Sequence, residues 1–532
     1  MTQESDFEQK AGYRTRWAGM IFIGISLLVI SIDNTILNVA LPSISRSLGA
    51  SAAELQWIIA AYVLMFAALL LTMGSLGDRF GRKRALQVGL IMFAIGSASA
   101  GFSKTTLMLI GSRAFLGIGG SLIMPSTLSI ISATFPTHER AKAIAIWAAV
   151  FGLGIGIGPV VGGWLIEQFS WNAVFFVNLP VAAVALTGGA FLLAESRDET
   201  ARRLDLPGIL LSIPGLFALI YGIIQAGQSS WTAPQVLIAF GAAIVLLVSF
   251  ALWENRSPQP MLPLYFFRNM SFTGANIAMV LVMFSMFGSV FFMSQYLQSV
   301  LGFTALESGI RMLPLGLTMM VFSVMSARLA ERVGTKYMVA LGIAIAGTAL
   351  LFMSQFFEVG TSYGTVVIGL ILLPAGLGLT MSPATNSIMQ SVPVNKAGIG
   401  SAMNDTTRQL GGALGVAILG TVMNNIYIKD IQAVKEAIPQ LPDQAFEVIA
   451  SSVQGAHIIV NNAPLPEAAK LVILDIANAA FVSGMSAAMF VGAFLMFSAS
   501  LLALAILPNR VQRPDSELSG EPQLTPAPAA GD

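Results

Sequence analysis

The chain of 532 residues is 55% hydrophobic and only 10% charged, whereas soluble domains average about 45–50% and about 25%. A soluble fold of this size could not bury that much apolar surface, and the net charge of +1 gives no basic footprint for nucleic acid. The chain has no Cys, which excludes disulfides and thiolate sites, and only His138 and His457 could supply imidazole ligands, so a metalloenzyme is a poor interpretation.

Apolar runs long enough to cross a bilayer recur along the whole chain. A hydrocarbon core of about 30 Å takes about 20 helical residues. The N-terminal tail, 1–16, is polar, and the apolar run after it lacks a cleavage pattern, so we interpret that run as a retained span. The sequence predicts fourteen spans, at about 17–39, 55–77, 85–103, 106–131, 141–166, 173–194, 206–226, 234–253, 272–296, 308–327, 337–357, 363–388, 402–424 and 480–507.

The positive charges predict the orientation of these spans. Most of the 28 Lys and Arg residues fall in alternate loops on the side of the N-terminus. Cytoplasmic loops carry such an excess, and an even number of spans places both tails on the same side. We therefore expect a multi-pass protein of a cell (inner or plasma) membrane, bacterial in type, with both termini cytoplasmic.

Two segments lie outside the membrane pattern. Residues 425–478 mix apolar and charged positions at helical spacing with Pro breaks, which predicts short amphipathic helices over the outer mouth. A lid, a partner site and a plain connector are all open interpretations of this segment. The tail, 508–532, is rich in Pro, Ser, Gly and acidic residues and is expected to be a disordered cytoplasmic tail.

Two short motifs occur twice, roughly half the chain apart. The loop Gly74–Lys83 is echoed by Leu329–Lys336, and Pro125–Ser129 is echoed by Pro383–Ser387. Repeated halves around a central cavity are an architecture of transporters.

This repeat predicts an all-α membrane fold of two six-helix bundles with two inserted helices. The expected parts are the N-terminal bundle 17–194, the insert 195–271 with its flanking loops, and the C-terminal bundle 272–507, which includes the external loop 425–478.

Four motifs in register resemble one family of transporters. Gly74–Lys83 is similar to the cytoplasmic signature of the major facilitator superfamily, and Asp33–Pro42 resembles the first-helix motif of its fourteen-span drug:proton antiporters. Arg113 with Gly117 and Gly119 resembles the fourth-helix motif, and the run Gly152–Gly163 resembles the antiporter motif of helix five. The resemblance covers the chain in order. It implies the major facilitator fold, transport by alternating access, and multidrug efflux that confers antibiotic resistance.

The repeated loop is a candidate gate. An acidic residue that faces a cationic helix end or an Arg can hold two helices together in one state and release them in the other. The same charges could simply anchor the loop at lipid headgroups. The expected gating residues are Gly74, Gly77, Asp78, Arg79, Gly81 and Arg82, and in the second copy Glu331, Arg332 and Gly334.

Asp33 lies inside an apolar run, where an ionised carboxylate is costly and usually faces a cavity. Arg113, in a Gly-rich span, is its candidate partner, and we expect the two to take part in proton coupling. A hydrated position near the outer end of the helix is the alternative for Asp33.

Asp405 and Arg408 form the counterpart in the C-terminal half. Residues three apart on a helix can neutralise one another. Asp405 could therefore bind the proton, bind a cationic substrate, or only pair with Arg408, and these options stay open. Asn404 and Gln409 are polar neighbours.

The glycines of span five occur at GxxxG spacing around a Pro that can kink the helix. The resemblance associates this motif with exchange, although close packing alone would also explain it. The motif residues are Gly152, Gly154, Gly156, Gly158, Pro159, Gly162 and Gly163.

The sequence favours secondary active transport over catalysis. It contains no phosphate-binding loop of the P-loop type and no catalytic cluster in the spans, so we expect no enzyme activity, no metal and no cofactor, with energy from a proton gradient. The expected partners are the lipid bilayer, protons and lipophilic or cationic small molecules, with no nucleic acid and a monomeric state. Export of a metabolite or peptide, or uptake by symport, is the alternative. The candidate substrate-binding residues are Asp33, Asn34, Asn38, Gln56, Trp57, Tyr62, Asn404, Asp405 and Gln409.

Overall fold

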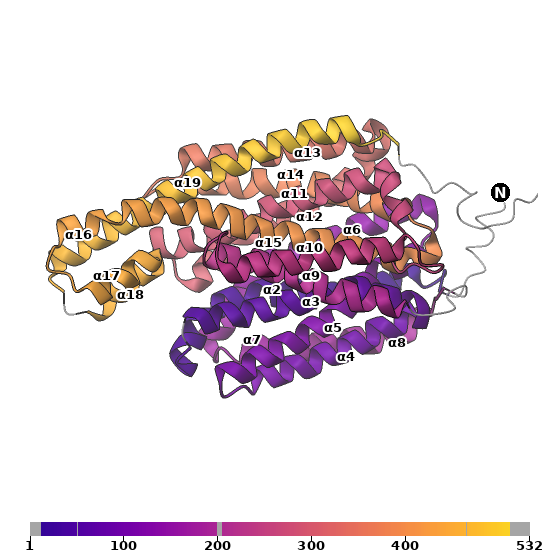
Figure 1. Ribbon diagram of the computed structural model, residues 1–532, viewed down its shortest axis with the longest axis horizontal. Coiled ribbons are helices and arrows are strands. Elements are labelled where there is room, and N and C mark those ends of the chain that lie inside the picture. The colour runs from indigo at the N-terminus through magenta and orange to yellow at the C-terminus, as the bar shows by residue number, and fades with distance from the viewer. Residues whose placement is uncertain (1–11, 51, 199–204, 464, 511–532) are drawn as a thin grey trace, which may run out of the picture.

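The computed structural model describes residues 12–50, 52–198, 205–463 and 465–510, and in these residues the chain is helical with no strand. Fourteen helices in this described part are long and apolar enough to cross a membrane. The all-α membrane fold predicted from the sequence is thereby confirmed. The crossing helices run roughly side by side along the long axis of the molecule (Figure 1).

The helices of the first half are α2 (Arg16–Leu48), α3 (Ala52–Phe80), α4 (Arg82–Gly101), α5 (Thr106–Thr134), α6 (Thr137–Gln168), and the short α7 (Ala173–Phe176) followed by α8 (Asn178–Leu192). Next come α9 (Leu206–Gln228), α10 (Pro234–Glu254) and the 3₁₀ turn η1 (Leu264–Arg268). The second half contains α11 (Met270–Gln295) with η2 (Tyr296–Val300), α12 (Ala305–Val333), α13 (Thr335–Phe356), α14 (Tyr363–Gln390), η3 (Val394–Lys396) with α15 (Ala397–Asp430), and α19 (Glu467–Ile506).

Both described ends of the chain, Gly12 and Arg510, lie at the same end of the bundle, which we call the terminus face (Figure 1). At the opposite end, α16 (Ala433–Ala437), α17 (Asp443–Ser451) and α18 (Val453–Asn462) form a projection. The projection is built on extensions of α15 and α19 and packs against those helices and η2. The predicted tail 508–532 lies outside the described residues beyond Arg510.

The two halves meet mainly along α6 and α12, and α15 packs against α3 and α5. The helices α9 and α10 pack on each other, and α9 also contacts α3 and α15, so this pair leans on both halves.

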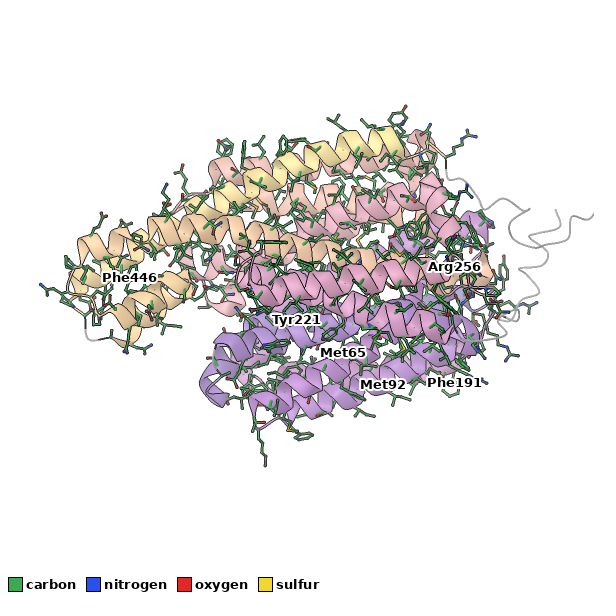
Figure 2. The ribbon with its side chains drawn as sticks, viewed as in Figure 1. Met65, Met92, Phe191, Tyr221, Arg256 and Phe446 are labelled. Atoms are coloured by element: carbon green, nitrogen blue, oxygen red, sulfur yellow. The ribbon has the colours of Figure 1, made fainter. Side chains whose placement is uncertain are left out.

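Large apolar side chains cover the outside of the bundle. Phe191 is 88% exposed, and Figure 2 shows it on the outer surface of the helices. Leu107 and Ile238 are also largely exposed. A water-facing surface rarely carries so many such residues, whereas a lipid-facing surface requires them.

The repeat predicted from the sequence has a matching backbone feature. Gly81 ends the α3–α4 turn at φ 117°, and Gly334 ends the α12–α13 turn at φ 98°. Side-chain-bearing residues avoid this region, so both turns require glycine. The two positions correspond in the repeated loop.

Candidate functional site

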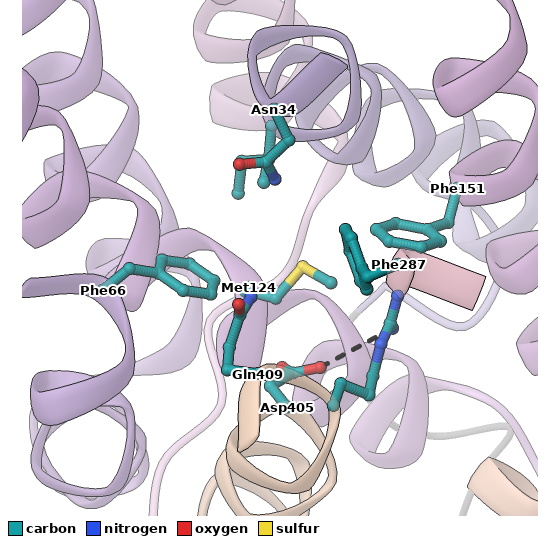
Figure 3. Close-up of a pocket in the computed structure, with 9 residues that line it drawn as sticks. Asn34, Phe66, Met124, Phe151, Phe287, Asp405 and Gln409 are labelled. Atoms are coloured by element: carbon teal, nitrogen blue, oxygen red, sulfur yellow. Dashed lines mark ion pairs between the residues drawn. The ribbon is translucent and has the colours of Figure 1, made fainter. Parts of the chain in front are cut away.

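A narrow cavity lies between helices of the two halves (Figure 3). Its volume of about 10 Å³ is close to the smallest space that holds one water molecule. A drug-sized compound therefore enters only after the halves move apart. The cavity is lined by Ile30, Asn34, Phe66, Met124, Phe151, Phe287, Asp405, Arg408 and Gln409.

Behind this cavity, in the first half, Asp33 and Arg113 form a completed ion pair. Arg113 Nη1 lies 2.5 Å from Asp33 Oδ2, and the two side chains are 2% and 1% exposed. Arg113 also donates through Nε to the carbonyl of Ile58 and stacks over the ring of Tyr62, 4.5 Å from its centroid. The structure thus places α2 and α5 in contact through the pair expected from the sequence, and Asp33 is buried rather than hydrated.

Asn178, at the start of α8, is a partner that the sequence analysis missed. Its amide donates to Asp33 Oδ1 at 3.1 Å and to Ser97 Oγ at 2.9 Å. Both oxygens of the Asp33 carboxylate are therefore hydrogen-bonded, so its charge is compensated on both sides. The only signal in the sequence is an amide two residues before Pro180 near the start of a span, which is too common to single out.

The glycines of α6 lie on two sides of the helix, and each side packs against a different neighbour. Gly154 and Gly158 leave space for Ser31 and Thr35 of α2, so a Cβ at either glycine would collide with these side chains. Those α2 residues lie two positions before and after Asp33.

The other side of α6 packs against α12. A Cβ at Gly156 would lie 2.8 Å from Gly316 Cα, and a Cβ at Gly152 would lie 2.6 Å from Met319. Pro159 faces Gly309 of α12, whereas Gly162 lies on the α2 side with Gly154 and Gly158 and packs against Ile36. Gly163 is buried in the same helix. Because α2 and α12 belong to different halves, α6 connects the helix of Asp33 to the interface between the halves.

At the terminus face, Asp78 and Arg82 hold the two halves together, and we call these contacts the latch. Asp78 accepts hydrogen bonds from Gly398 N at 2.9 Å and Ile399 N at 3.2 Å, at the start of α15. Arg82 donates to Asp78 at 2.8 Å and to the carbonyls of Val394 and Asn395. A carboxylate bound to free backbone N–H groups at a helix N-terminus is stabilised by both the hydrogen bonds and the helix dipole.

The glycines near the latch allow this close approach. A Cβ at Gly74 would lie 2.6 Å from both Ala402 Cβ and Gly398 O, whereas Gly77 faces Ala85 at 3.5 Å. Arg79 does not join the latch contacts and lies over the ring of Phe80.

The second copy of the loop makes no corresponding latch in the described residues. Glu331 and Arg332 are exposed, and Gly334 packs against Asn509 at the end of α19. Arg82, which closes the first latch, corresponds to Thr335, and Thr335 cannot supply a guanidinium. The two copies thus differ at both latch positions, since Asp78 corresponds to Glu331 and Arg82 to Thr335.

The remaining substrate-binding candidates separate into three groups. Gln56 and Trp57 are exposed near the start of α3, where Trp57 stacks on Tyr221 at 6.2 Å, so they lie away from the cavity. Tyr62 is buried and stacks on Phe66, a lining residue. The side chain of Asn38 lies outside the described part of the chain.

Asn404 points into the second half and not into the cavity. It accepts from Thr385 at 3.1 Å and donates to Asp405 at 3.2 Å. Asp405 and Gln409, one and five positions further along the same helix, do line the cavity, opposite Asn34 (Figure 3).

Asp405 and Arg408 are close but incompletely paired. Arg408 Nη1 lies 3.8 Å from Asp405 Oδ1, beyond hydrogen-bond distance, although the side chains are only 3% and 1% exposed. The guanidinium instead stacks on Phe151 of α6, 3.9 Å from the ring centroid.

Comparison with known proteins agrees with this geometry. Residues 23–416 match the model of the Major Facilitator Superfamily. The chain belongs to this superfamily. Its members are transporters, and with fourteen apolar helices this one is a multi-pass membrane protein.

Among curated members of the superfamily, the chain is 32% identical over 524 residues to the "Tetracenomycin C resistance and export protein" of Streptomyces glaucescens, covering 98% of this chain and 96% of that one. It is 35% identical over 485 residues to the "Multidrug efflux pump LfrA" of Mycolicibacterium smegmatis, covering 91% and 95%. The resemblance predicted from the four motifs is confirmed by these matches.

Solved structures of the superfamily share the fold. The proton:xylose symporter XylE superimposes with a TM-score of 0.61 at 12% identity, covering 94% of this chain and 98% of that one. The human organic anion transporter MFSD10 gives a TM-score of 0.60 at 15% identity, covering 93% and 100%. At such identities only the fold is comparable.

Proposed function

We propose that this transporter is a proton-coupled antiporter that exports lipophilic compounds, cationic drugs and other toxic compounds among them, from the cytoplasm. Export of drugs is supported by the names of the relatives, which are multidrug efflux and antibiotic resistance or export proteins. In this proposal the terminus face is the cytoplasmic side, which the excess of positive charges in its loops supports.

The observation that carries the proposal is the position of Asp33. It is a buried acid on a membrane-spanning helix, it neighbours Asn34 in the cavity wall, and it is ion-paired to Arg113. Such residues in membrane spans are costly and mark proton or ion pathways. A proton on Asp33 would neutralise it and leave the Arg113 charge without its counter-ion.

The packing of α6 couples the helix that carries Asp33 to the interface between the halves. The glycine side formed by Gly154 and Gly158 fits the α2 residues on either side of Asp33, and the opposite side fits α12. A shift of α2 on protonation would therefore be passed to the contact with the other half. In this account α6 has two packing arrangements, and the charge on Asp33 decides which of them is favoured.

The latch stabilises the conformation in which the cytoplasmic mouth is closed relative to the one in which it is open. While Asp78 binds the N-terminus of α15, the terminus face stays closed, and the cavity can open only on the other side. Releasing the latch would open the cytoplasmic side and admit a compound from the cytoplasm. In this account Asp405 and Gln409, on the α15 wall of the cavity, contact the cargo.

The test is transport by the purified protein in proteoliposomes loaded with a lipophilic cationic dye, rhodamine 123. An imposed pH gradient is expected to drive dye movement opposite to the proton flow, and a protonophore is expected to abolish it. Dye movement that ignores the gradient, or movement in the same direction as the protons, would refute antiport.

A further inference from the structure

Arg408 is a buried cation whose hydrogen-bonding groups are unused. Its side chain is 3% exposed, and neither Nη1 nor Nη2 has a hydrogen-bond partner. Arg113, which is equally buried, donates to a carboxylate and to a backbone carbonyl. A buried Arg whose Nη groups make no hydrogen bonds has lost its hydrogen bonds to water without replacing them.

The surroundings of Arg408 fix its orientation without occupying its N–H groups. One face of the guanidinium lies on Phe151, and Trp147 lies 5.0 Å away. Trp147 is itself held by a hydrogen bond from its Nε1 to Thr127 at 2.9 Å. Aromatic rings cover the face of a guanidinium and leave its edge free to donate in the plane.

Asp405 does not use this edge. Its Oδ1 is 3.8 Å from Arg408 Nη1, and its other oxygen, Oδ2, has no partner. One helix turn therefore presents unused donors and an unused acceptor to the same cavity, between the rings of Phe66, Phe151 and Phe287 (Figure 3).

We propose that Arg408 determines substrate class by binding an acidic group, a carboxylate or a phenolate, of an aromatic lipophilic compound. This inference rests on the proposed export function and extends its cargo from cations to amphoteric aromatic compounds. The acidic group takes the free edge of Arg408, the rings pack between the Phe side chains, and a cationic nitrogen on the same compound satisfies Asp405 Oδ2. A planar fork such as a guanidinium pairs with a carboxylate through two parallel hydrogen bonds.

A matched pair of fluorescent compounds isolates the acidic group. Rhodamine 110 carries a free carboxyl group, and rhodamine 123 is its methyl ester, so the two share one cationic ring system and differ only at that group. Transport of each is measured in proteoliposomes under an imposed pH gradient for the wild type, Arg408→Gln and Arg408→Lys. The control is Arg311→Gln, because Arg311 also stacks on a Phe, 3.8 Å from the ring centroid of Phe303, but does not line the cavity.

For Arg408→Gln, the ratio of rhodamine 110 transport to rhodamine 123 transport is expected to fall about tenfold or more, as loss of a charge-assisted pair predicts. Arg408→Lys keeps the charge and is expected to retain part of the rhodamine 110 transport. An equal loss for both dyes, or no loss for either, would overturn the inference.

Two further measurements use the wild type alone, so they hold even if the variants fail to fold. Rhodamine 110 is expected to be transported and to compete with rhodamine 123. If the wild type moves rhodamine 123 with the gradient but neither moves nor binds rhodamine 110, this inference fails and antiport stands. If it moves neither dye, the proposed function fails.

Discussion

Replacing Asp78 by Asn perturbs the latch without changing the shape of the side chain. The Asp78 carboxylate accepts from Arg82 at 2.8 Å and from the N–H groups of Gly398 and Ile399. Asn keeps one acceptor oxygen and turns the other into an NH₂ that faces N–H donors. Losing the charge and at least one of these bonds costs about 3 kcal/mol in the latched state. The released state lacks these contacts, so the latched-to-released ratio falls about a hundredfold.

Spin labels on the two halves can measure this shift, because the chain has no Cys and two introduced ones are labelled cleanly. Arg84 of α4 and Arg332 at the end of α12 are both exposed at the terminus face. Electron–electron distance measurements are expected to give one distance in the labelled wild type and a second, longer one in Asp78→Asn. The same single distribution in a well-folded variant would refute the latch.

Two further predictions follow from the packing of α6 and the hydrogen bonds of the buried acid. Gly156→Val is expected to abolish dye efflux while leaving membrane insertion intact, because the new side chain collides with the Gly316 backbone. The matched control is Gly111→Val, where a Cβ meets nothing within 4 Å. Equal dye efflux by the two variants would contradict the close contact. Asn178→Leu removes one hydrogen-bond partner of Asp33 and is expected to lower gradient-driven efflux about tenfold. The control is Asn172→Leu in the same assay. Unchanged efflux in Asn178→Leu would count against a role for this hydrogen bond.

The sequence predicts the number of spans better than their lengths. Hydropathy places the last span at 480–507, whereas α19 begins at Glu467. Lys470 and Asp475 lower the local hydropathy, but a helix continues beyond the bilayer wherever its backbone bonds are satisfied. The extension supports the projection of α16–α18, which lies within the segment 425–478 that the sequence predicts to form short helices.

The candidate site is only partly visible in the sequence. Asp33 and Arg113 stand out because charges are rare in apolar runs, and the structure brings them together. The stacking of Arg408 on Phe151 depends on how α15 meets α6, which no local pattern reports. Likewise, Trp57 is a polar-tipped aromatic near a span end, and nothing in the sequence shows that it stacks on Tyr221 away from the cavity.

Separating proton-driven transport from substrate exchange in Asp33→Asn tests the central claim most directly. The variant keeps the size of the side chain but cannot release a proton. In proteoliposomes it is expected to lose pH-gradient-driven movement of rhodamine 123 while retaining exchange of labelled for unlabelled dye across the membrane. Gradient-driven transport that survives in the variant would show that Asp33 does not couple the proton.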